Sequence, residues 1–175
     1  ELRAPLTPEQ QKVYLAYLKK ARGEIARELA SAGPEKSRMK ILAALTRLRQ
    51  ICCHPALFLE NYQGDSGKFQ LFQEVLAEAL AGGHRVLVFS QFTSMLEILE
   101  RYLKETGIAH FYLHGAVNPE ERLRLAQAFN QGQGQVFLIS LKAGGTGLNL
   151  TGADMVIHYD PWWNPAVEEQ ATDRA

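Results

Sequence analysis

The sequence of 175 residues has few cysteines, no net charge and no long apolar run. Its only cysteines, Cys52 and Cys53, are adjacent and lack a CxxC partner, which argues against a disulfide framework and a zinc site, so we interpret them as buried thiols. No apolar run approaches the ~18 residues that span a bilayer, and residues 1–6 have neither the basic nor the apolar region of a secretory signal. We therefore expect an intracellular protein, located in the cytoplasm or nucleoid of a bacterium or in the nucleus of a eukaryote.

Basic and acidic side chains are equally frequent, 19 of each, but they are unevenly distributed. Residues 1–60 hold 11 Lys and Arg against 6 Asp and Glu, a net charge of +5, so residues 61–175 carry a net charge of −5. We interpret this basic excess as a solvated helix face rather than a polyanion site. The length and the 46% hydrophobic content indicate a folded globular protein of one domain with an appendage.

The N-terminal part of the chain has the pattern of two helices. Apolar residues recur at helical spacing over residues 7–30, where Thr7 can cap the first turn, and again over residues 37–53. Gly33 and Pro34 lie between the two stretches and are expected to end the first helix.

A polar, turn-rich stretch at residues 61–67 marks a change of pattern, and we place the domain boundary there. Residues 1–60 then form a helical segment and residues 61–175 a second domain. In that domain short, continuously apolar strands alternate with amphipathic helices, which predicts an α/β fold, a parallel sheet with helices on both faces. The expected strands are 86–89, 111–113, 136–139 and 155–159, and the expected helices are 68–81, a helix from Thr93 to Gly107, 118–129 and one beginning at Asn164.

Ligands of open parallel sheets bind beyond the carboxyl ends of the strands. This rule selects four loops, which begin at Ser90, His114, Ser140 and Asp160. Three polar residues in these loops can be explained as helix N-caps without any ligand: Thr93, Asn118 and Asn164.

The loop at residues 140–150 contains three glycines, which allow backbone amides to approach an anion closely. It matches neither a P-loop nor the GxGxxG fingerprint, so we expect it to form only part of a nucleotide site. The loop that begins at Asp160 carries Trp162 and Trp163 between two prolines. These rings either complete a core or, if exposed, offer a stacking surface.

Five segments of the second domain carry distinctive sequences in a fixed order. They are VLVFSQF at 86–92, HG at 114–115 with Arg122, SLKAGGTGLNL at 140–150, DPWWNP at 160–165 and QATDRA at 170–175. This ordered set resembles the motifs of the second RecA-like lobe of Swi/Snf-family DNA-dependent ATPases. Residues 48–55 (LRQICCHP) are similar to the helical segment that precedes that lobe.

The resemblance implies a superfamily-two motor that holds ATP in a cleft between two lobes and runs on double-stranded DNA. The residues that would face the nucleotide are Gly145, Gly147 and Asn149, and those at or near the DNA backbone are Ser90, Gln91, His114, Gly115, Arg122, Ser140 and Lys142. Trp162 and Trp163 would couple DNA contact to the ATP cleft. In the catalytic final motif, Arg174 matches the first of two arginines, the second being the arginine finger. The first RecA-like lobe, with its P-loop and Mg²⁺-binding acids, would be the other partner, so we expect a fragment that is inactive alone and stops within its last motif.

Two other functions remain open from the residues alone. A free-standing α/β hydrolase could combine Ser90 or Ser140 with His114 and Asp160, although the chain has no GxSxG elbow. Alternatively, residues 1–60 and the two tryptophans could form a protein-binding module without catalysis.

Overall fold

The computed structural model describes residues 1–144, 147–161 and 172–173, and the chain divides into two compact units, Glu1–Phe72 and Gln73–Ala175. The division falls within one helix, α2 (Gly67–Ala81). No helix in the described ranges is both long and apolar enough to cross a membrane.

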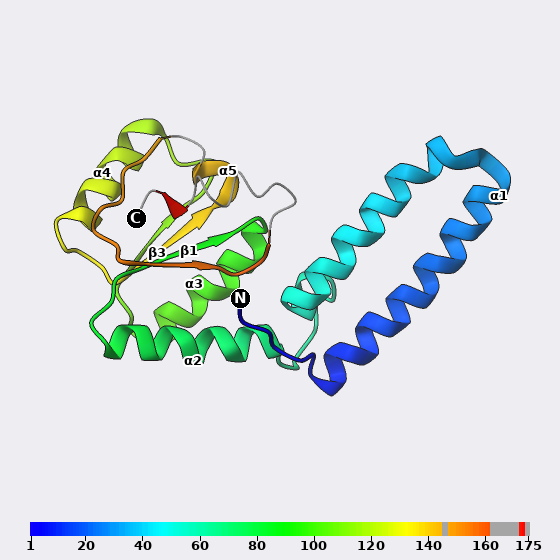
Figure 1. The fold of residues 1–175 in the computed structure, drawn as a ribbon, viewed down its shortest axis with the longest axis horizontal. Coiled ribbons are helices and arrows are strands. Elements are labelled where there is room, and N and C mark those ends of the chain that lie inside the picture. Colours follow the sequence, from blue (N-terminus) through cyan, green and yellow to red (C-terminus); the bar gives the residue numbers. More distant parts are fainter. Residues whose placement is uncertain (145–146, 162–171, 174–175) are drawn as a thin grey trace. The chain divides into compact units, whose positions relative to one another are not determined.

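The first unit is built on α1 (Pro8–Cys53), whose two arms run antiparallel on either side of a sharp bend (Figure 1). Gly33 causes the bend because its φ of 79° lies in the left-handed region, which glycine adopts without a Cβ penalty, and Pro34 follows it. The predicted pair of helices with a break at Gly33 and Pro34 is therefore confirmed. Thr7 is the N-cap, as expected, and it forms a capping box with Gln10.

Gln10 fastens the open end of the two arms together. Its side chain is fully buried, and Nε2 donates to the carbonyl oxygens of Ile51 at 2.9 Å and Cys52 at 3.2 Å. Near the bend, Lys40 Nζ pairs with Glu28 Oε2 at 2.5 Å. These contacts hold α1 as a helical hairpin.

The turn η1 (Pro55–Leu57) follows α1 and is capped by His54, whose Nδ1 accepts from the amide of Ala56 at 3.1 Å. Burial lowers the pKa of His54, and the nearby charge of Asp65 opposes that shift. Both cysteines are free thiols, but only Cys53 is fully buried, while Cys52 is half-buried with a pKa that burial raises.

The second unit contains a sheet of four parallel strands in the order β2-β3-β1-β4. These are β1 (Val86–Ser90), β2 (His110–Leu113), β3 (Val136–Ser140) and β4 (Met155–His158). All residues of the two central strands are buried, which explains why their sequences are continuously apolar.

Helices cover both faces of this sheet. Phe89, Phe137 and Ile139 lie in one apolar cluster with Phe129 of α4 (Pro119–Asn130). Because side chains alternate along a strand, Val88 and its neighbours in β3 point to the other face, where α3 (Thr93–Glu105) contacts β1 and β3. The expected α/β architecture, with a helical segment before it, is confirmed.

Two local predictions were wrong. Thr93 is the first residue of α3 rather than its cap. Phe92 occupies the N-cap, where its apolar side chain makes no hydrogen bond, and its amide donates to Ser90 Oγ at 3.1 Å. The start of the glycine-rich segment, predicted as loop, is a one-turn helix α5 (Leu141–Gly144). Ser140 stabilises this turn by accepting from the amide of Ala143 at 3.2 Å.

Candidate functional site

The loops that follow the four strands lie at the carboxyl edge of the sheet, as expected. In the register Ser90 pairs with Ser140, Leu113 pairs with Ile139, and the amide of Tyr159 donates to the carbonyl of Phe89 at 2.9 Å. The strands therefore end at nearly the same level, and their loops start side by side.

A buried carboxylate joins two of these loops. Asp160 is 2% exposed and Ser90 is fully buried. Oδ1 of Asp160 accepts from Ser90 Oγ, and Oδ2 accepts from the amide of Gln91 at 3.1 Å. Gln91 Nε2 also donates to the carbonyl of Pro161 at 3.3 Å. Three hydrogen bonds therefore join the turn after β1 to the segment after β4.

Ser140 and Lys142 have different environments although they are two residues apart. Ser140 is 3% exposed and its hydroxyl caps α5. The side chain of Lys142 is exposed to solvent. Within this turn, Lys142 presents the positive charge and Ser140 fixes the backbone that carries it.

Hydrogen bonds from α4 fix the loop after β2. Arg122 Nε donates to the carbonyl of Val117 at 2.7 Å, and Nη2 donates to the carbonyl of Gly115 at 3.0 Å. Asn118 caps α4 through the amide of Glu121 at 2.9 Å, which confirms its predicted capping role. Arg122 thus shapes the loop, and the exposed main chain of Gly115 faces open space.

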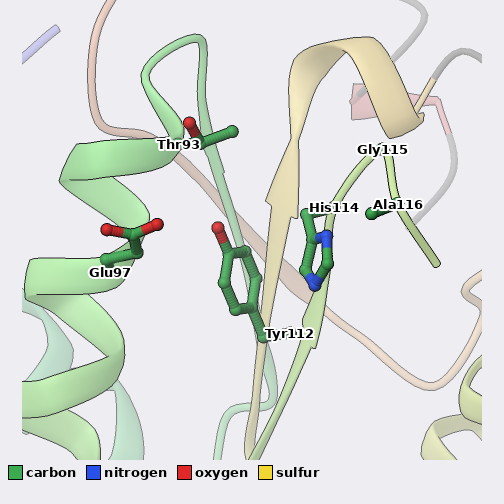
Figure 2. Close-up of a pocket in the computed structure, with 6 residues that line it drawn as sticks. All are labelled: Thr93, Glu97, Tyr112, His114, Gly115 and Ala116. Carbon is green, nitrogen blue, oxygen red and sulfur yellow. The ribbon is translucent and has the colours of Figure 1, made fainter.

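A cavity of about 300 Å³ opens beside this loop. Figure 2 shows the ring of Tyr112 standing between Glu97 of α3 and the imidazole of His114. Burial raises the pKa of Tyr112, and the negative charges of Glu97 and Glu100 raise it further. The remaining lining residues are Thr93, Gly115 and Ala116.

Gly147 and Asn149 are exposed in the second half of the glycine-rich loop. Gly147 has a φ of 69° with no atom near the position of a Cβ, so its backbone is open to an approaching ligand. The carbonyl of Asn149 accepts from Asn130 Nδ2 at 2.9 Å. Asn130 Oδ1 accepts from the amide of Gly152 at 2.9 Å, so one side chain of α4 spans the end of this loop.

Arg85, just before β1, completes this support, and sequence reasoning missed it. Its Nη1 donates to the carbonyl of Gly152 at 2.7 Å, its Nε donates to the carbonyl of Gly134 at 3.1 Å, and its guanidinium lies 4.0 Å from the centre of the Phe129 ring. A Cβ on Gly152 would lie 2.7–2.8 Å from atoms of Arg85, Phe129 and Asn130. The return of the loop to β4 is therefore tightly packed.

Four of the predicted site residues lie outside the described residues: Gly145, Trp162, Trp163 and Arg174. The same is true of Asn164 and of the helix expected to begin there. In the short described piece near the end of the chain, Thr172 Oγ1 lies 3.1 Å from His158 Nε2 of β4.

The arrangement required for a Ser-His-Asp hydrolase is not formed by the described residues. Ser90 bonds directly to Asp160, Ser140 caps a helix, and within the described ranges no hydrogen bond joins His114 to either serine. A triad needs the histidine between the nucleophile and the acid. In the same ranges, no group of three or more His, Cys, Asp or Glu side chains is placed to hold a metal ion.

Residues 67–175 match the family described as helicase conserved C-terminal domain. The solved C-terminal domain of the Sulfolobus solfataricus SWI2/SNF2 ATPase superposes with a TM-score of 0.82 at 35% identity, covering 96% of this chain and 74% of that one. The chain belongs to the Swi/Snf branch of this helicase family. The core of the same ATPase, solved in complex with double-stranded DNA, matches with a TM-score of 0.82 at 34% identity, over 98% of this chain and 36% of that one.

Curated relatives of this Swi/Snf domain are much longer proteins. The Bacillus subtilis protein YwqA, which is named provisionally as an ATP-dependent helicase/translocase, is 40% identical over 177 residues, covering 98% of this chain and 19% of that protein. The human SWI/SNF-related matrix-associated actin-dependent regulator of chromatin subfamily A member 1 is 38% identical over 161 residues, covering 85% of this chain and 16% of that protein. The chain thus spans about a fifth or less of these relatives.

In this Swi/Snf domain the structure brings some predicted residues together and separates others. Ser90 and Gln91 share the Asp160 carboxylate, and Gly115 is bonded to Arg122. The residues that sequence reasoning missed are the ones that support the loops: Asp160 as a bridge, Asn130 and Arg85. Asp160 was considered only as a hydrolase acid, and no local pattern marks the other two as partners of a distant loop.

Proposed function

We propose that this Swi/Snf domain is the second motor lobe of an ATP-dependent translocase or remodeller of double-stranded DNA. It supplies contacts to the DNA backbone and one wall of the nucleotide site, and it does not hydrolyse ATP by itself. The names of the relatives support the use of ATP. The Sulfolobus core in complex with double-stranded DNA supports DNA as the substrate.

The observation that carries this proposal is the buried Asp160 bridge. It ties the Ser90–Gln91 turn, which the family resemblance assigns to DNA, to the segment that leads into Trp162 and Trp163. A motor needs a rigid connection between the loop that contacts DNA and the segment that couples this contact to the nucleotide site. Ser90 is buried and therefore positions the turn, while the exposed Lys142 and the main chain of Gly115 are available to phosphates.

Contacts of this kind suit translocation that is independent of DNA sequence. Phosphate contacts through amides, small donors and single cations position a protein on the duplex without reading bases. The described loops present such groups: the amide side chain of Gln91, the ammonium of Lys142 and the open backbone at Gly115.

For the nucleotide, the residues present fit one side of a site. The exposed backbone around Gly147 and Asn149 is open to a polyanion or ribose, and we assign it together with Gly145 to the wall facing ATP. The absence of a P-loop from the sequence assigns the triphosphate grip to the first RecA-like lobe. Mg²⁺, held by that lobe, would neutralise charge on the phosphates.

Closure of the two lobes completes the chemistry in this proposal. Arg174 belongs to the final motif, which the closed state brings to the γ-phosphate, and Trp162 and Trp163 couple that closure to DNA contact. Splitting the phosphate grip and the arginines between two lobes makes hydrolysis conditional on closure, because phosphoryl transfer depends on positioning and charge neutralisation.

A grafted enzyme tests the proposal. This chain replaces the aligned segment of B. subtilis YwqA, and ATP turnover is measured with and without duplex DNA. The graft should show DNA-stimulated turnover, and the chain alone should show none. Lys142→Gln should raise the DNA concentration for half-maximal stimulation, whereas Arg101→Gln, which removes an exposed cation of α3, should leave it unchanged.

Arg174→Ala in the graft should leave DNA affinity nearly intact and lower turnover by orders of magnitude, because Arg174 shares the final motif with the arginine finger, and such fingers contribute roughly 10³–10⁵-fold. Robust hydrolysis by the chain alone would contradict the two-lobe argument. A graft that binds DNA but never turns over ATP would instead support a binding module.

A further inference from the structure

The two arms of α1 turn matching faces toward each other. Inward positions on the first arm are Gln10, Ala21 and Glu28, and those on the second arm are Ser37, Ala44, Leu48 and Ile51. They recur at intervals of 3, 4, 7 and 11 residues, which are close to whole numbers of turns. The position directly before each inward residue therefore points to one side of the hairpin, and the position directly after it points to the other side.

Because the arms are antiparallel, the residues that precede inward residues lie on the same side of the hairpin in both arms. An approximate two-fold axis perpendicular to the plane of the hairpin exchanges the arms and leaves each side of the plane where it is. Positions that precede inward residues on both arms consequently share one side of the hairpin.

That side is basic. Lys20, Arg27, Lys36 and Arg47 each directly precede an inward residue, and all four side chains are exposed. We call these four residues the basic flank. Glu9 is the one acidic residue in the same series and lies in the first turn, at the far end of its arm from the bend. The exposed carboxylate nearest in sequence is that of Glu24, one turn from both Lys20 and Arg27, and among the described residues it forms no ion pair with either.

The opposite side is different in character. Two exposed leucines, Leu29 and Leu45, directly follow inward residues and lie on it. Two exposed arginines, Arg22 and Arg38, directly follow inward residues and lie among them. One side of the hairpin therefore carries four exposed cations, and the other carries two exposed leucines together with two exposed arginines.

The cations of the basic flank are not neutralised within the described residues. Arg27 Nε donates to the neutral carbonyl of Gly23 at 3.2 Å, and Arg47 Nη1 donates to Gln50 Oε1 at 3.0 Å. In the ranges that the structure describes, none of the four makes an ion pair with a carboxylate, whereas Lys40 is paired with Glu28. Lys20 and Arg27 are seven residues apart, or roughly 10 Å along the helix.

We propose that the basic flank binds the phosphate backbone of duplex DNA, as a contact separate from the loops at the carboxyl edge of the sheet. The inference rests on the proposed function for the choice of DNA. Charge complementarity supports it: residues 61–175 carry a net charge of −5, so attraction for a polyanion must come largely from residues 1–60, which carry +5. It revises the interpretation of that excess as merely solvated.

The experiment measures binding of the chain to a fluorescein-labelled DNA duplex by anisotropy over a range of salt concentrations. The test variant is Lys20→Gln with Arg47→Gln, and the matched control is Arg22→Gln with Arg38→Gln, which removes the same charge from the opposite side of the same hairpin. Because all four side chains are exposed, circular dichroism melting should show that both variants remain folded.

Each lost phosphate contact lowers the slope of log affinity against log salt by about 0.9. In the test variant the magnitude of this slope should therefore fall by about two, and the affinity for DNA at ~0.1 M salt should fall roughly 50-fold. The affinity of the control variant should stay within about twofold of that of the unmodified chain. Equal losses in both variants would overturn the proposal, because net charge alone would then explain them. It would also be overturned by no loss in the test variant, or by no binding of the unmodified chain. ATP turnover of the graft, measured separately, decides the proposed function.

Discussion

Replacing Asp160 with alanine removes two hydrogen-bond acceptors from the carboxyl edge of the sheet, at a side chain that is only 2% exposed. One oxygen accepts from Ser90 Oγ and the other from the amide of Gln91. Hydrogen bonds to charged groups contribute about 1.5–3 kcal/mol each, so the free energy of unfolding should fall by about 3–6 kcal/mol. Ser90→Ala loses one of these bonds and also the acceptor for the amide of Phe92, and should cost about 1–3 kcal/mol.

Urea unfolding followed by tryptophan fluorescence suits this measurement, because both tryptophans of the chain, Trp162 and Trp163, lie in the second unit. The single variants and the double variant form a thermodynamic cycle. Its coupling energy should be about 1–2 kcal/mol if the hydroxyl and the carboxylate act together. Glu78→Ala, which removes an exposed carboxylate of α2, is the control and should change stability by less than about 0.5 kcal/mol. A coupling energy near zero, or an Asp160→Ala protein as stable as its parent, would refute the bridge.

Burial lowers the pKa of His54 from its usual value of 6.5, so the folded protein binds this proton less tightly than the unfolded chain does. The free energy of unfolding should therefore be highest above pH 6.5 and should fall as the pH drops through the lower pKa of the folded state. His54→Asn, which keeps a capping acceptor, should flatten this dependence when urea midpoints are followed by circular dichroism. Gly152→Ala should destabilise the second unit by about 1–3 kcal/mol or more, because its Cβ would lie 2.7 Å from Arg85 Nη1; normal tryptophan-detected unfolding would contradict this packing. Gly147→Ala should cost about 1–2 kcal/mol and raise KM for ATP in the graft, because its φ is 69°. Gly23→Ala, in α1 with no positive φ and no atom near the position of a Cβ, is the control and should leave KM for ATP unchanged.

The regular elements could be predicted because each is encoded by short-range pattern. The strand at Val86–Ser90 reads as a continuous apolar run because it is buried on both faces, and Asn118 marks a helix start because its side chain binds an amide three residues later. The N-cap prediction failed at Thr93 because a competing bond from Ser90 fixes the backbone one residue earlier. Such a bond depends on the turn that Asp160 holds in place, 70 residues away in sequence.

The candidate site was predictable at the level of loops and not at the level of contacts. Because the strands are parallel, the sequence places Ser90, Ser140 and His114 in loops at one edge of the sheet. The order of the strands, which makes β3 the neighbour of both β1 and β2, comes from the structure. The sequence does not indicate that both serines are buried and bonded within the fold rather than presented at the surface. The support from Asn130 and Arg85 reaches main-chain carbonyls, which every residue has, so no side-chain pattern in the sequence records it.

The reversal of α1 depends on one residue in a left-handed conformation, Gly33, followed by Pro34. If that residue were replaced by one that favours right-handed helix, the most direct alternative for the 46-residue element is one continuous helix of ~70 Å that is kinked at Pro34. The second arm would then leave its place beside Gln10, and the vacated surface is complementary to the same arm from another molecule. An exchange of arms between two copies is thus the characteristic hazard of substitutions at this turn, and it would appear as a dimer in which each half retains its native contacts.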